Sequence, residues 1–176
     1  TSGNTGVGLA VGAAIKGYRC IFVMPDKMSQ EKISMLRAYG AEVVICPTAV
    51  EPDSPESYYS VSDRLAEEIP GGFKPDQYSN MANPDAHYEV TGPEIWEQTG
   101  GKLDAVVAAQ GTGGWITGVA RFLDEQGSPA RIYAVEPAEC ALISDGEWGP
   151  HGIAGIGDGI VPKNLDLSVI DGIVKV

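Results

Sequence analysis

The stretch VVAAQGTGGWITG, residues 106–118, decides the fold class of this chain because it joins an apolar strand to a helix through a glycine loop. The apolar run at residues 104–109 predicts a buried strand, and residues 115–126 have helical spacing. A second apolar strand is predicted at residues 131–136. A strand that reaches the next strand through a helix is the connection typical of a parallel sheet.

The same alternation of strands and helices runs along the rest of the chain. Further strands are predicted at residues 20–24, 42–46, 76–78 and 169–174, and further helices at residues 5–16, 29–38, 55–69, 84–91 and 93–99. Ser29 and Ser54 are the expected N-caps of two of these helices. The strands are continuously apolar rather than alternating, which is typical of a sheet buried on both faces. The sequence therefore predicts an α/β fold, a doubly wound parallel sheet covered by helices on both faces.

The charge composition of the sequence indicates which classes of binding partner to expect. The 176 residues carry 24 acidic and 12 basic side chains, a formal net charge of -12. So acidic a surface repels nucleic acid and anionic lipid, and we expect neither as a partner. No apolar run approaches the roughly 20 residues needed to cross a membrane, and no signal peptide opens the sequence, so a cytoplasmic location is predicted. Cys20, Cys46 and Cys140 are scattered, which argues against a disulfide framework and a zinc site.

The opening residues, Thr1-Ser2-Gly3-Asn4-Thr5-Gly6, place hydroxyl, amide and glycine groups just before a predicted helix. Free amides at a helix start carry partial positive charge, and the side chains add hydrogen-bond donors. The pattern predicts a cradle for a carboxylate or phosphate. A plain N-cap is the alternative, because Ser, Thr and Asn are favoured there in any helix.

The second candidate loop is Gly111-Thr112-Gly113-Gly114. Its amides and the Thr112 hydroxyl are suited to wrap a phosphate dianion, whereas a tight turn without a ligand is the simpler alternative. A dinucleotide fingerprint is a third interpretation, with Glu136 as the ribose partner at the end of the next strand. The glycine spacing disagrees with that fingerprint, because neither Trp115 nor Ile116 supplies its third glycine.

Together these loops resemble those of the cysteine synthase and cystathionine β-synthase family of pyridoxal-phosphate enzymes. Residues 1–6 resemble its substrate-binding asparagine loop, and residues 111–114 resemble its phosphate-binding loop. Further similar segments lie in the same order along the chain, at residues 18–20, 24–29, 37–42, 76–80, 83–84, 92–96 and 155–159. The resemblance implies an incomplete fold-type II domain, tryptophan-synthase-β-like. It places residues 13–90 in a smaller mobile lobe and residues 91–176 in part of a larger lobe.

The resemblance also implies roles for individual residues. The substrate side would be formed by Thr1, Ser2, Gly3, Asn4, Thr5, Gln77 and Gly155. The cofactor, pyridoxal 5'-phosphate, would be held by Asn4, Gly111, Thr112, Gly113, Gly114 and Trp115. No metal is implied. The two histidines, His87 and His151, are expected to be structural or surface residues rather than acid–base catalysts.

Two positions depart from the family pattern. The family's Schiff-base lysine lies upstream of the asparagine loop, so we expect this chain to be part of a longer polypeptide and to contain no catalytic residue itself. Its seven lysines are expected to be solvated at the surface: Lys16, Lys27, Lys32, Lys74, Lys102, Lys163 and Lys175. Trp115 stands where the family usually has threonine, which removes one hydroxyl from the phosphate cradle.

The family reaction is β-replacement, in which the β-substituent of a serine-type amino acid is eliminated and a sulfur nucleophile adds. Residues 57–64 resemble cystathionine β-synthase-like members, whereas residues 149–153 and 162–167 are more similar to cysteine synthases. We favour cysteine synthesis from O-acetylserine and sulfide, because the second group adjoins the pocket glycines. Cystathionine synthesis, serine or threonine deamination and a non-catalytic module stay open. The resemblance further implies a homodimer and a serine acetyltransferase partner.

Overall fold

The structure is a computed structural model that describes residues 3–51, 53–153, 155–157 and 159–176. It divides into two units, Thr1–Lys74 and Pro75–Val176, which are described in turn. The first holds the opening loop, and the second holds the phosphate-type loop, Gln77 and Gly155. Both contain parallel sheets and helices, which confirms the predicted α/β class.

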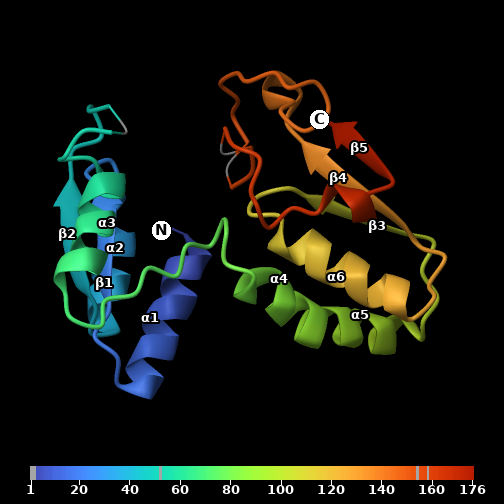
Figure 1. Cartoon of the computed structure of the whole chain (residues 1–176), viewed down its shortest axis with the longest axis horizontal. Coiled ribbons are helices and arrows are strands. Elements are labelled where there is room, and N and C mark those ends of the chain that lie inside the picture. The colour runs from blue at the N-terminus through green and yellow to red at the C-terminus, as the bar shows by residue number, and fades with distance from the viewer. Residues whose placement is uncertain (1–2, 52, 154, 158) are drawn as a thin grey trace. The chain divides into compact units, whose positions relative to one another are not determined.

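The first unit has a two-stranded parallel sheet with helices on both faces (Figure 1). Its elements are α1 (Asn4–Lys16), β1 (Ile21–Pro25), α2 (Gln30–Ala38), β2 (Glu42–Cys46) and α3 (Tyr58–Glu68). Successive strand residues point to opposite faces of a sheet. Phe22 and Met24 accordingly pack against α1 and α2, whereas Val23 packs against Val61 of α3. Both faces of this sheet are therefore buried, as predicted.

The second unit has a three-stranded parallel sheet in the order β3-β4-β5. Its elements are α4 (Ala82–Ala86), the π-helical turn η1 (His87–Thr91), α5 (Gly92–Thr99), β3 (Ala105–Ala109), α6 (Gly114–Glu125), β4 (Arg131–Glu136), the 3₁₀ turns η2 (Ala138–Cys140) and η3 (Leu167–Val169), and β5 (Gly172–Lys175). Ile116, Val119 and Leu123 of α6 pack on the sheet. The α4–η1–α5 segment forms a further layer along α6 (Figure 1).

Helices cover one face of this second sheet within the described residues. On its other face Val107 is 61% exposed and Val174 is 41% exposed. The continuous apolar runs of β3 and β5 had predicted helices on both faces. The strands are apolar throughout because their second face also carries apolar side chains, although no described helix covers that face.

The boundary between the units lies earlier than the lobe boundary suggested by family resemblance. Residues 75–90 belong with the second unit because α4 and η1 pack along α6. Gly118 permits this close packing, since a Cβ there would lie 2.8 Å from His87 Cβ and would clash with the Pro84 carbonyl oxygen. The division of the whole enzyme into lobes near residue 90 stays a prediction.

Several predicted elements shift in the structure. Ser29 caps α2 by accepting a hydrogen bond from the Lys32 amide at 3.4 Å, as predicted. The cap of α3 is Ser57 rather than Ser54, and the helix begins at Tyr58. The predicted strand at residues 76–78 is wrong: the chain turns there, with Asp76 at φ 45° and its carbonyl accepting from the Asn80 amide. Such a turn suits a short polar segment that has no neighbouring strand.

The predicted helices at residues 84–91 and 93–99 join into one continuous helical segment. Gly92 has helical dihedral angles, φ -59° and ψ -52°, and Pro93 follows it. Proline lacks an N–H and its ring crowds the carbonyl one turn earlier. The wide π-turn η1 precedes it, which is a common way for a helix to absorb such a defect. The final predicted strand, residues 169–174, begins later, at Gly172, because Leu167–Val169 form a 3₁₀ turn.

Candidate cofactor and substrate site

The phosphate-type loop, residues 111–114, follows β3 directly and starts helix α6. The Gln110 amide donates to the Val135 carbonyl at 2.9 Å, which extends the β3–β4 pairing up to the loop. Gly113 is the N-cap of α6 with φ 77°, a left-handed conformation that favours glycine. A Cβ at Gly113 would lie 2.6 Å from Leu165 Cβ. The sequence thus forms a tight, glycine-dependent turn at the carboxyl edge of the sheet.

The amides of this turn are free to bind an anion. The first α6 amide with a helical acceptor is that of Thr117, which donates to the Gly113 carbonyl at 3.1 Å. The amides of residues 111–116 have no acceptor among the described residues. Gly113 and Gly114 are nevertheless buried, and buried amides normally find a partner. A phosphate dianion would satisfy several of these donors at a positive helix end, so the loop fits such a group.

A side-chain network ties this loop to Gln77. The Asn83 side-chain amide donates to Thr112 Oγ1 at 3.0 Å and to the Gln77 carbonyl at 2.8 Å. Asn164 Nδ2 donates to the same carbonyl at 2.7 Å. Thr112 and Gln77, both predicted site residues, are therefore brought together. Asn83 and Asn164 were not singled out as site residues, although the Asn83-Pro84 pair was part of the family resemblance.

Gly155, the predicted substrate-side glycine, lies against the same loop. A Cβ at Gly111 would approach the Gly155 carbonyl oxygen to 3.1 Å, and Gly155 itself has φ 87°. The neighbouring Gly157 amide donates to the Gln110 carbonyl at 3.5 Å. These contacts place the 155–157 segment beside the predicted phosphate cradle.

Both histidines have structural roles. His151 Nε2 pairs with the Gly157 carbonyl at 2.9 Å, and His151 Nδ1 accepts from the Ile153 amide at 3.3 Å. Because Nδ1 accepts from the Ile153 amide, Nε2 is the nitrogen that donates to the Gly157 carbonyl, and the ring holds the glycine turn. His87 Nδ1 lies 2.9 Å from Thr91 Oγ1 inside η1, and burial lowers the His87 pKa. Neither histidine needs a catalytic role to explain its position.

The Glu136 side chain accepts hydrogen bonds from backbone amides and is not exposed to bind a ribose. The side chain is 1% exposed and accepts hydrogen bonds from the Ile143 amide at 2.9 Å and from the Ser144 amide at 3.0 Å. The Ser144 hydroxyl donates to it as well. A carboxylate that is buried and held by three donors is not accessible to a dinucleotide ribose. The dinucleotide interpretation therefore loses its acidic partner as well as its third glycine.

Trp115 occupies the second residue of α6 and is half-buried. Its side chain packs against the hydrophobic core of the second unit. The side chain therefore contributes packing at the edge of the loop and supplies no hydroxyl to it. The Trp115 amide remains one of the free donors at the helix start.

In the first unit, Gly3 is the N-cap of α1 and makes no side-chain cap bond. Asn4 and Thr5 lie in the first turn and are exposed, so neither side chain serves as the cap. This removes the plain N-cap explanation for those two residues. Thr1 and Ser2, also predicted to bind substrate, lie outside the described residues.

All seven lysines are exposed, as predicted for solvated surface residues. Lys74 pairs with Asp63 at 2.5 Å, and Lys175 pairs with Asp145 at 2.8 Å. Within the described part of the chain, no cluster of His, Cys, Asp and Glu is arranged to hold a metal ion. No described helix has the length and apolar character required to traverse a membrane.

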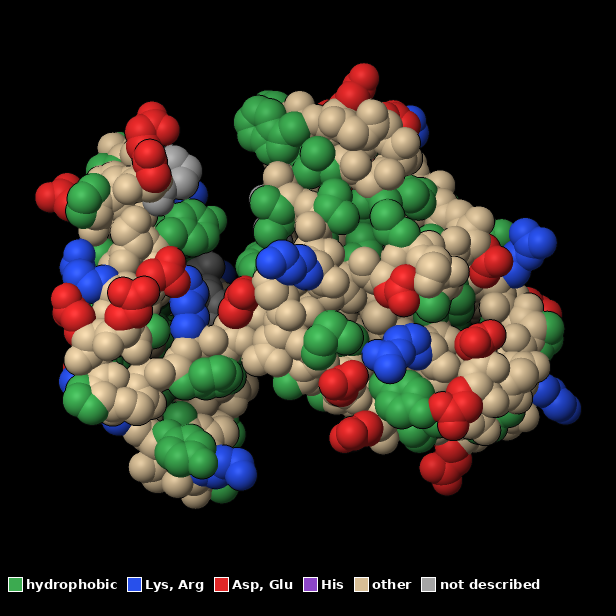
Figure 2. Space-filling view, viewed as in Figure 1, with side chains coloured by type: hydrophobic (Ala, Val, Ile, Leu, Met, Phe, Trp, Pro, Cys, Tyr) green, Lys and Arg blue, Asp and Glu red, His purple; other side chains and the backbone are tan. Residues whose placement is uncertain are grey.

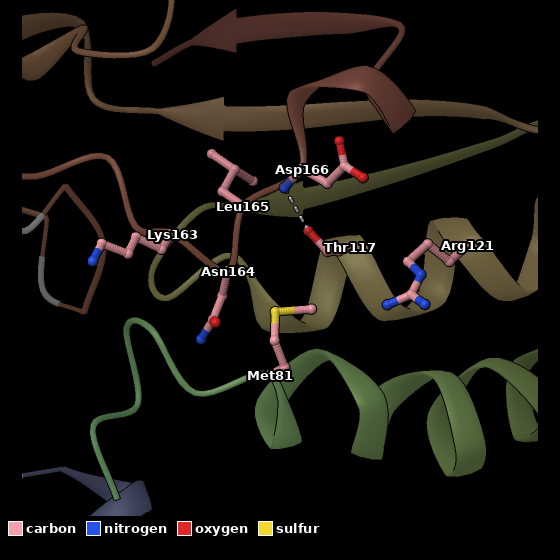
Figure 3. Close-up of a pocket in the computed structure, with 7 residues that line it drawn as sticks. All are labelled: Met81, Thr117, Arg121, Lys163, Asn164, Leu165 and Asp166. Carbon is pink, nitrogen blue, oxygen red and sulfur yellow. Dashed lines mark hydrogen bonds between the residues drawn. The ribbon is translucent and has the colours of Figure 1, made fainter.

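An open hollow of about 570 Å³ lies beside the network between α4 and α6 (Figure 3). It is lined by Met81, Thr117, Arg121, Lys163, Asn164, Leu165 and Asp166. Thr117 Oγ1 accepts a hydrogen bond from the Asp166 amide at 3.0 Å, which ties the 163–166 segment to α6 (Figure 3). The hollow adjoins the back of the phosphate-type loop, because Leu165 also contacts Gly113.

Comparison with known proteins identifies this arrangement. The model of a family described as pyridoxal-phosphate dependent enzyme matches residues 1–176. Cystathionine beta-synthase from Oryctolagus cuniculus is 51% identical over 97% of the chain, and cysteine synthase 3 from Caenorhabditis elegans is 47% identical over 100% of it. The chain spans only 32% and 51% of those two proteins.

Solved structures give the same answer for the fold. Cysteine synthase from Entamoeba histolytica matches with a TM-score of 0.91 and 39% identity, and a hydrogen sulfide-producing enzyme from Fusobacterium nucleatum matches with 0.90 and 39%. Each comparison covers 100% of this chain, and it covers 51% and 57% of the two structures, respectively. The tryptophan-synthase-β-like fold predicted from family resemblance is thereby confirmed, in part of its length.

Proposed function

This chain belongs to the family of pyridoxal-phosphate dependent enzymes, and on that premise we propose that the full-length protein makes cysteine by β-replacement. The substrates are O-acetylserine, or a related activated serine, and sulfide. The observation that carries the proposal is the row of free amides at residues 111–116, which fits a phosphate ester at the start of α6. The bound cofactor supplies an electron sink for chemistry at the substrate's α-carbon.

The residues of this chain would bind the cofactor and the amino-acid substrate and orient them for reaction. The amides of residues 111–115 and the Thr112 hydroxyl would hold the cofactor phosphate, and the family resemblance implies that Asn4 would contact the ring hydroxyl. By the same resemblance, Ser2, Asn4, Thr5 and Gln77 would hold the α-carboxylate of the amino acid, with Thr1, Gly3 and Gly155 on the substrate side. Preorganised donors of this kind lower the barrier because they are already oriented when charge develops.

Cystathionine β-synthase activity is the second candidate, and a specific observation favours it. The rabbit enzyme of that name is 51% identical to this chain, slightly above the 47% of the nematode cysteine synthase. Both reactions are β-replacements on a serine-type amino acid. They differ in the leaving group, acetate or water, and in the sulfur nucleophile.

A nucleophile assay separates these candidates. Purified full-length enzyme is given O-acetylserine with sulfide in one arm and serine with homocysteine in the other. Clear preference for sulfide is expected, measured as kcat/KM for cysteine formation. A preference for homocysteine would transfer the assignment to cystathionine synthesis, and keto-acid release without any thiol would contradict both.

The Schiff-base lysine of the full-length protein is proposed to lie outside these 176 residues. Borohydride reduction of the holoenzyme followed by peptide mapping tests this. The label is expected on a peptide outside the chain described here. Labelling of any of its seven exposed lysines would overturn the proposed lysine position while leaving cofactor binding intact.

The oligomeric state, the protein partner and the cellular location of the full-length protein are also proposals from the family resemblance. We infer a homodimer, a serine acetyltransferase partner and a cytoplasmic setting from the family resemblance. Sedimentation of the full-length protein, alone and with the acetyltransferase from the same source, tests the first two. A protein that sediments as a monomer and does not bind the acetyltransferase would contradict both proposals.

A further inference from the structure

We propose that Asn83 is a positioning residue that couples the phosphate loop to the substrate-binding Gln77, an inference that rests on the function proposed above. A side-chain amide has two N–H groups. In Asn83 one donates to Thr112 Oγ1 at 3.0 Å and the other to the Gln77 carbonyl at 2.8 Å. One side chain thereby fixes a residue of the cofactor cradle and a residue of the carboxylate site at once.

The contact with Thr112 sets the direction of its hydroxyl. A threonine hydroxyl has a single proton to donate and lone pairs that accept. Since Asn83 donates to the Thr112 oxygen, the Thr112 proton is left for another acceptor. The amides of residues 111–116 have no acceptor among the described residues and belong to the same loop, so a phosphate oxygen bound there is the acceptor we propose for this proton. Asn83 therefore acts through Thr112, without touching the cofactor itself.

The Asn83 side chain is held in place by glycines on α6. A Cβ at Gly114 would clash with Asn83 Oδ1, so this close approach requires glycine at the helix start. One turn further along, the Pro84 carbonyl occupies the space beside Gly118. The beginning of α4 is thus pressed against α6, and Asn83 has little freedom to adopt another conformation.

The Gln77 carbonyl accepts a second hydrogen bond besides the one from Asn83. Asn164 Nδ2 donates to the same carbonyl at 2.7 Å, and the next residue, Leu165, packs against Gly113. Asn164 is 1% exposed, which makes this anchor rigid. Loss of Asn83 would leave Gln77 partly held but would free the Thr112 hydroxyl. The stronger effect is therefore expected on cofactor binding and the weaker one on the amino-acid KM.

The test uses full-length enzyme stripped of cofactor and titrated with pyridoxal 5'-phosphate. N83A is expected to weaken cofactor affinity about tenfold, as is T112V, because each removes a hydrogen bond that serves a charged group. The double variant N83A/T112V should be no weaker than T112V alone. The nearly isosteric N83D should be at least as damaging as N83A, because its carboxylate would accept the Thr112 proton and repel the phosphate.

Asn80 supplies the matched control. It lies in the same turn, donates to the Pro75 carbonyl at 2.9 Å and accepts from the Ala82 amide at 3.0 Å, away from the loop. N80A is expected to lower the melting temperature while keeping cofactor affinity within twofold of wild type. The ³¹P chemical shift of the bound cofactor should move in N83A and stay constant in N80A.

The outcomes separate this inference from the proposed function. If wild-type enzyme binds the cofactor normally and N83A and N83D stay within twofold of it, the coupling role is wrong while the function stands. Additive losses in N83A/T112V would also overturn the coupling. Wild-type enzyme that binds no pyridoxal 5'-phosphate would overturn both. Should N83A fold poorly, N83D carries the comparison because it keeps the shape of the side chain.

Discussion

At the scale of single residues, Trp115 is the position where the phosphate loop departs from the family. W115T is expected to strengthen cofactor binding by about tenfold or more, because a hydrogen bond to a charged group contributes roughly 1.5–3 kcal/mol. It should also lower stability, since the indole packs against the core. Cofactor titration and thermal unfolding of full-length protein measure the two effects. W148T, which alters an indole that is 69% exposed, is the control; equal affinities for W115T and wild type would contradict the prediction.

Glu136 is a buried side chain whose carboxyl oxygens accept hydrogen bonds from two backbone amides. E136Q replaces one acceptor oxygen by an NH₂ group that faces either the Ile143 amide or the Ser144 amide. An unsatisfied or repelled buried donor costs about 1–3 kcal/mol, so the free energy of unfolding should fall by that amount. Urea denaturation of this chain measures it. The exposed neighbour Glu139, changed to Gln, should leave stability nearly unaltered; an unchanged midpoint for E136Q would show that the carboxylate is dispensable.

At the scale of elements, the glycines of α6 and α1 should respond in opposite ways to alanine. G118A is expected to destabilise this chain by about 1–3 kcal/mol, because its Cβ would meet α4 and η1. G12A should stabilise it by about 0.5–1 kcal/mol, because no atom lies within 4 Å of the new Cβ and glycine is a poor helix former. The midpoints of urea denaturation measure both effects. If G12A destabilised the chain, or if G118A left its stability unchanged, the helix packing described above would be contradicted.

The π-helical turn η1 should make stability sensitive to mild acid. Burial lowers the His87 pKa, so the unfolded chain binds the proton more readily than the folded one. The corresponding stability is fully present above the unfolded pKa of about 6.5 and is lost as pH falls toward the folded pKa. Unfolding free energies at pH 7.5 and 5.5 measure this. H87N should show a smaller difference between the two values, and an equal difference would exclude His87 as the cause.

At the scale of the whole molecule, acidic side chains are scattered over the face of each unit that Figure 2 shows. The open face of the β3–β5 sheet is apolar instead. Register places Val107 beside Tyr133 and Val135 beside Val174 on that face, where Val107 is 61% exposed and Val174 is 41% exposed. Exposed apolar patches of this kind are interaction or aggregation surfaces.

We therefore expect this chain by itself to bind a hydrophobic dye at that face. V107K should reduce the fluorescence of bound anilinonaphthalene sulfonate and increase solubility, because a charge on an edge strand blocks apolar association. The matched control is I15K, which alters an apolar side chain that is 81% exposed on α1 of the other unit. Equal dye binding by V107K and wild type would show that the sheet face is not the binding surface.

Much of the fold was predictable from local patterns. The strands at residues 42–46 and 131–136 match the structure, because β-branched apolar runs between turn residues suit few other conformations. The errors fall where two local signals compete. Ser54 and Ser57 are both good caps, and only the start of packing against Val23 and Cys46 selects Ser57. Residues 76–78 are short and polar, and their turn depends on distant partners such as Asn83 and Asn164.

The sequence by itself determined the row of free amides that we propose as the phosphate cradle, because free amides at the start of a helix are a property of adjacent residues. A strand, a glycine turn and a helix in succession suffice for it. Only the tertiary structure decided how Thr112, Gln77 and Gly155 come together. Asn83 reaches Thr112 across 29 residues and Asn164 reaches Gln77 across 87, so these contacts exist only once α4 packs on α6. That packing follows from side-chain shape, above all the missing Cβ atoms of Gly114 and Gly118, which no local pattern reveals.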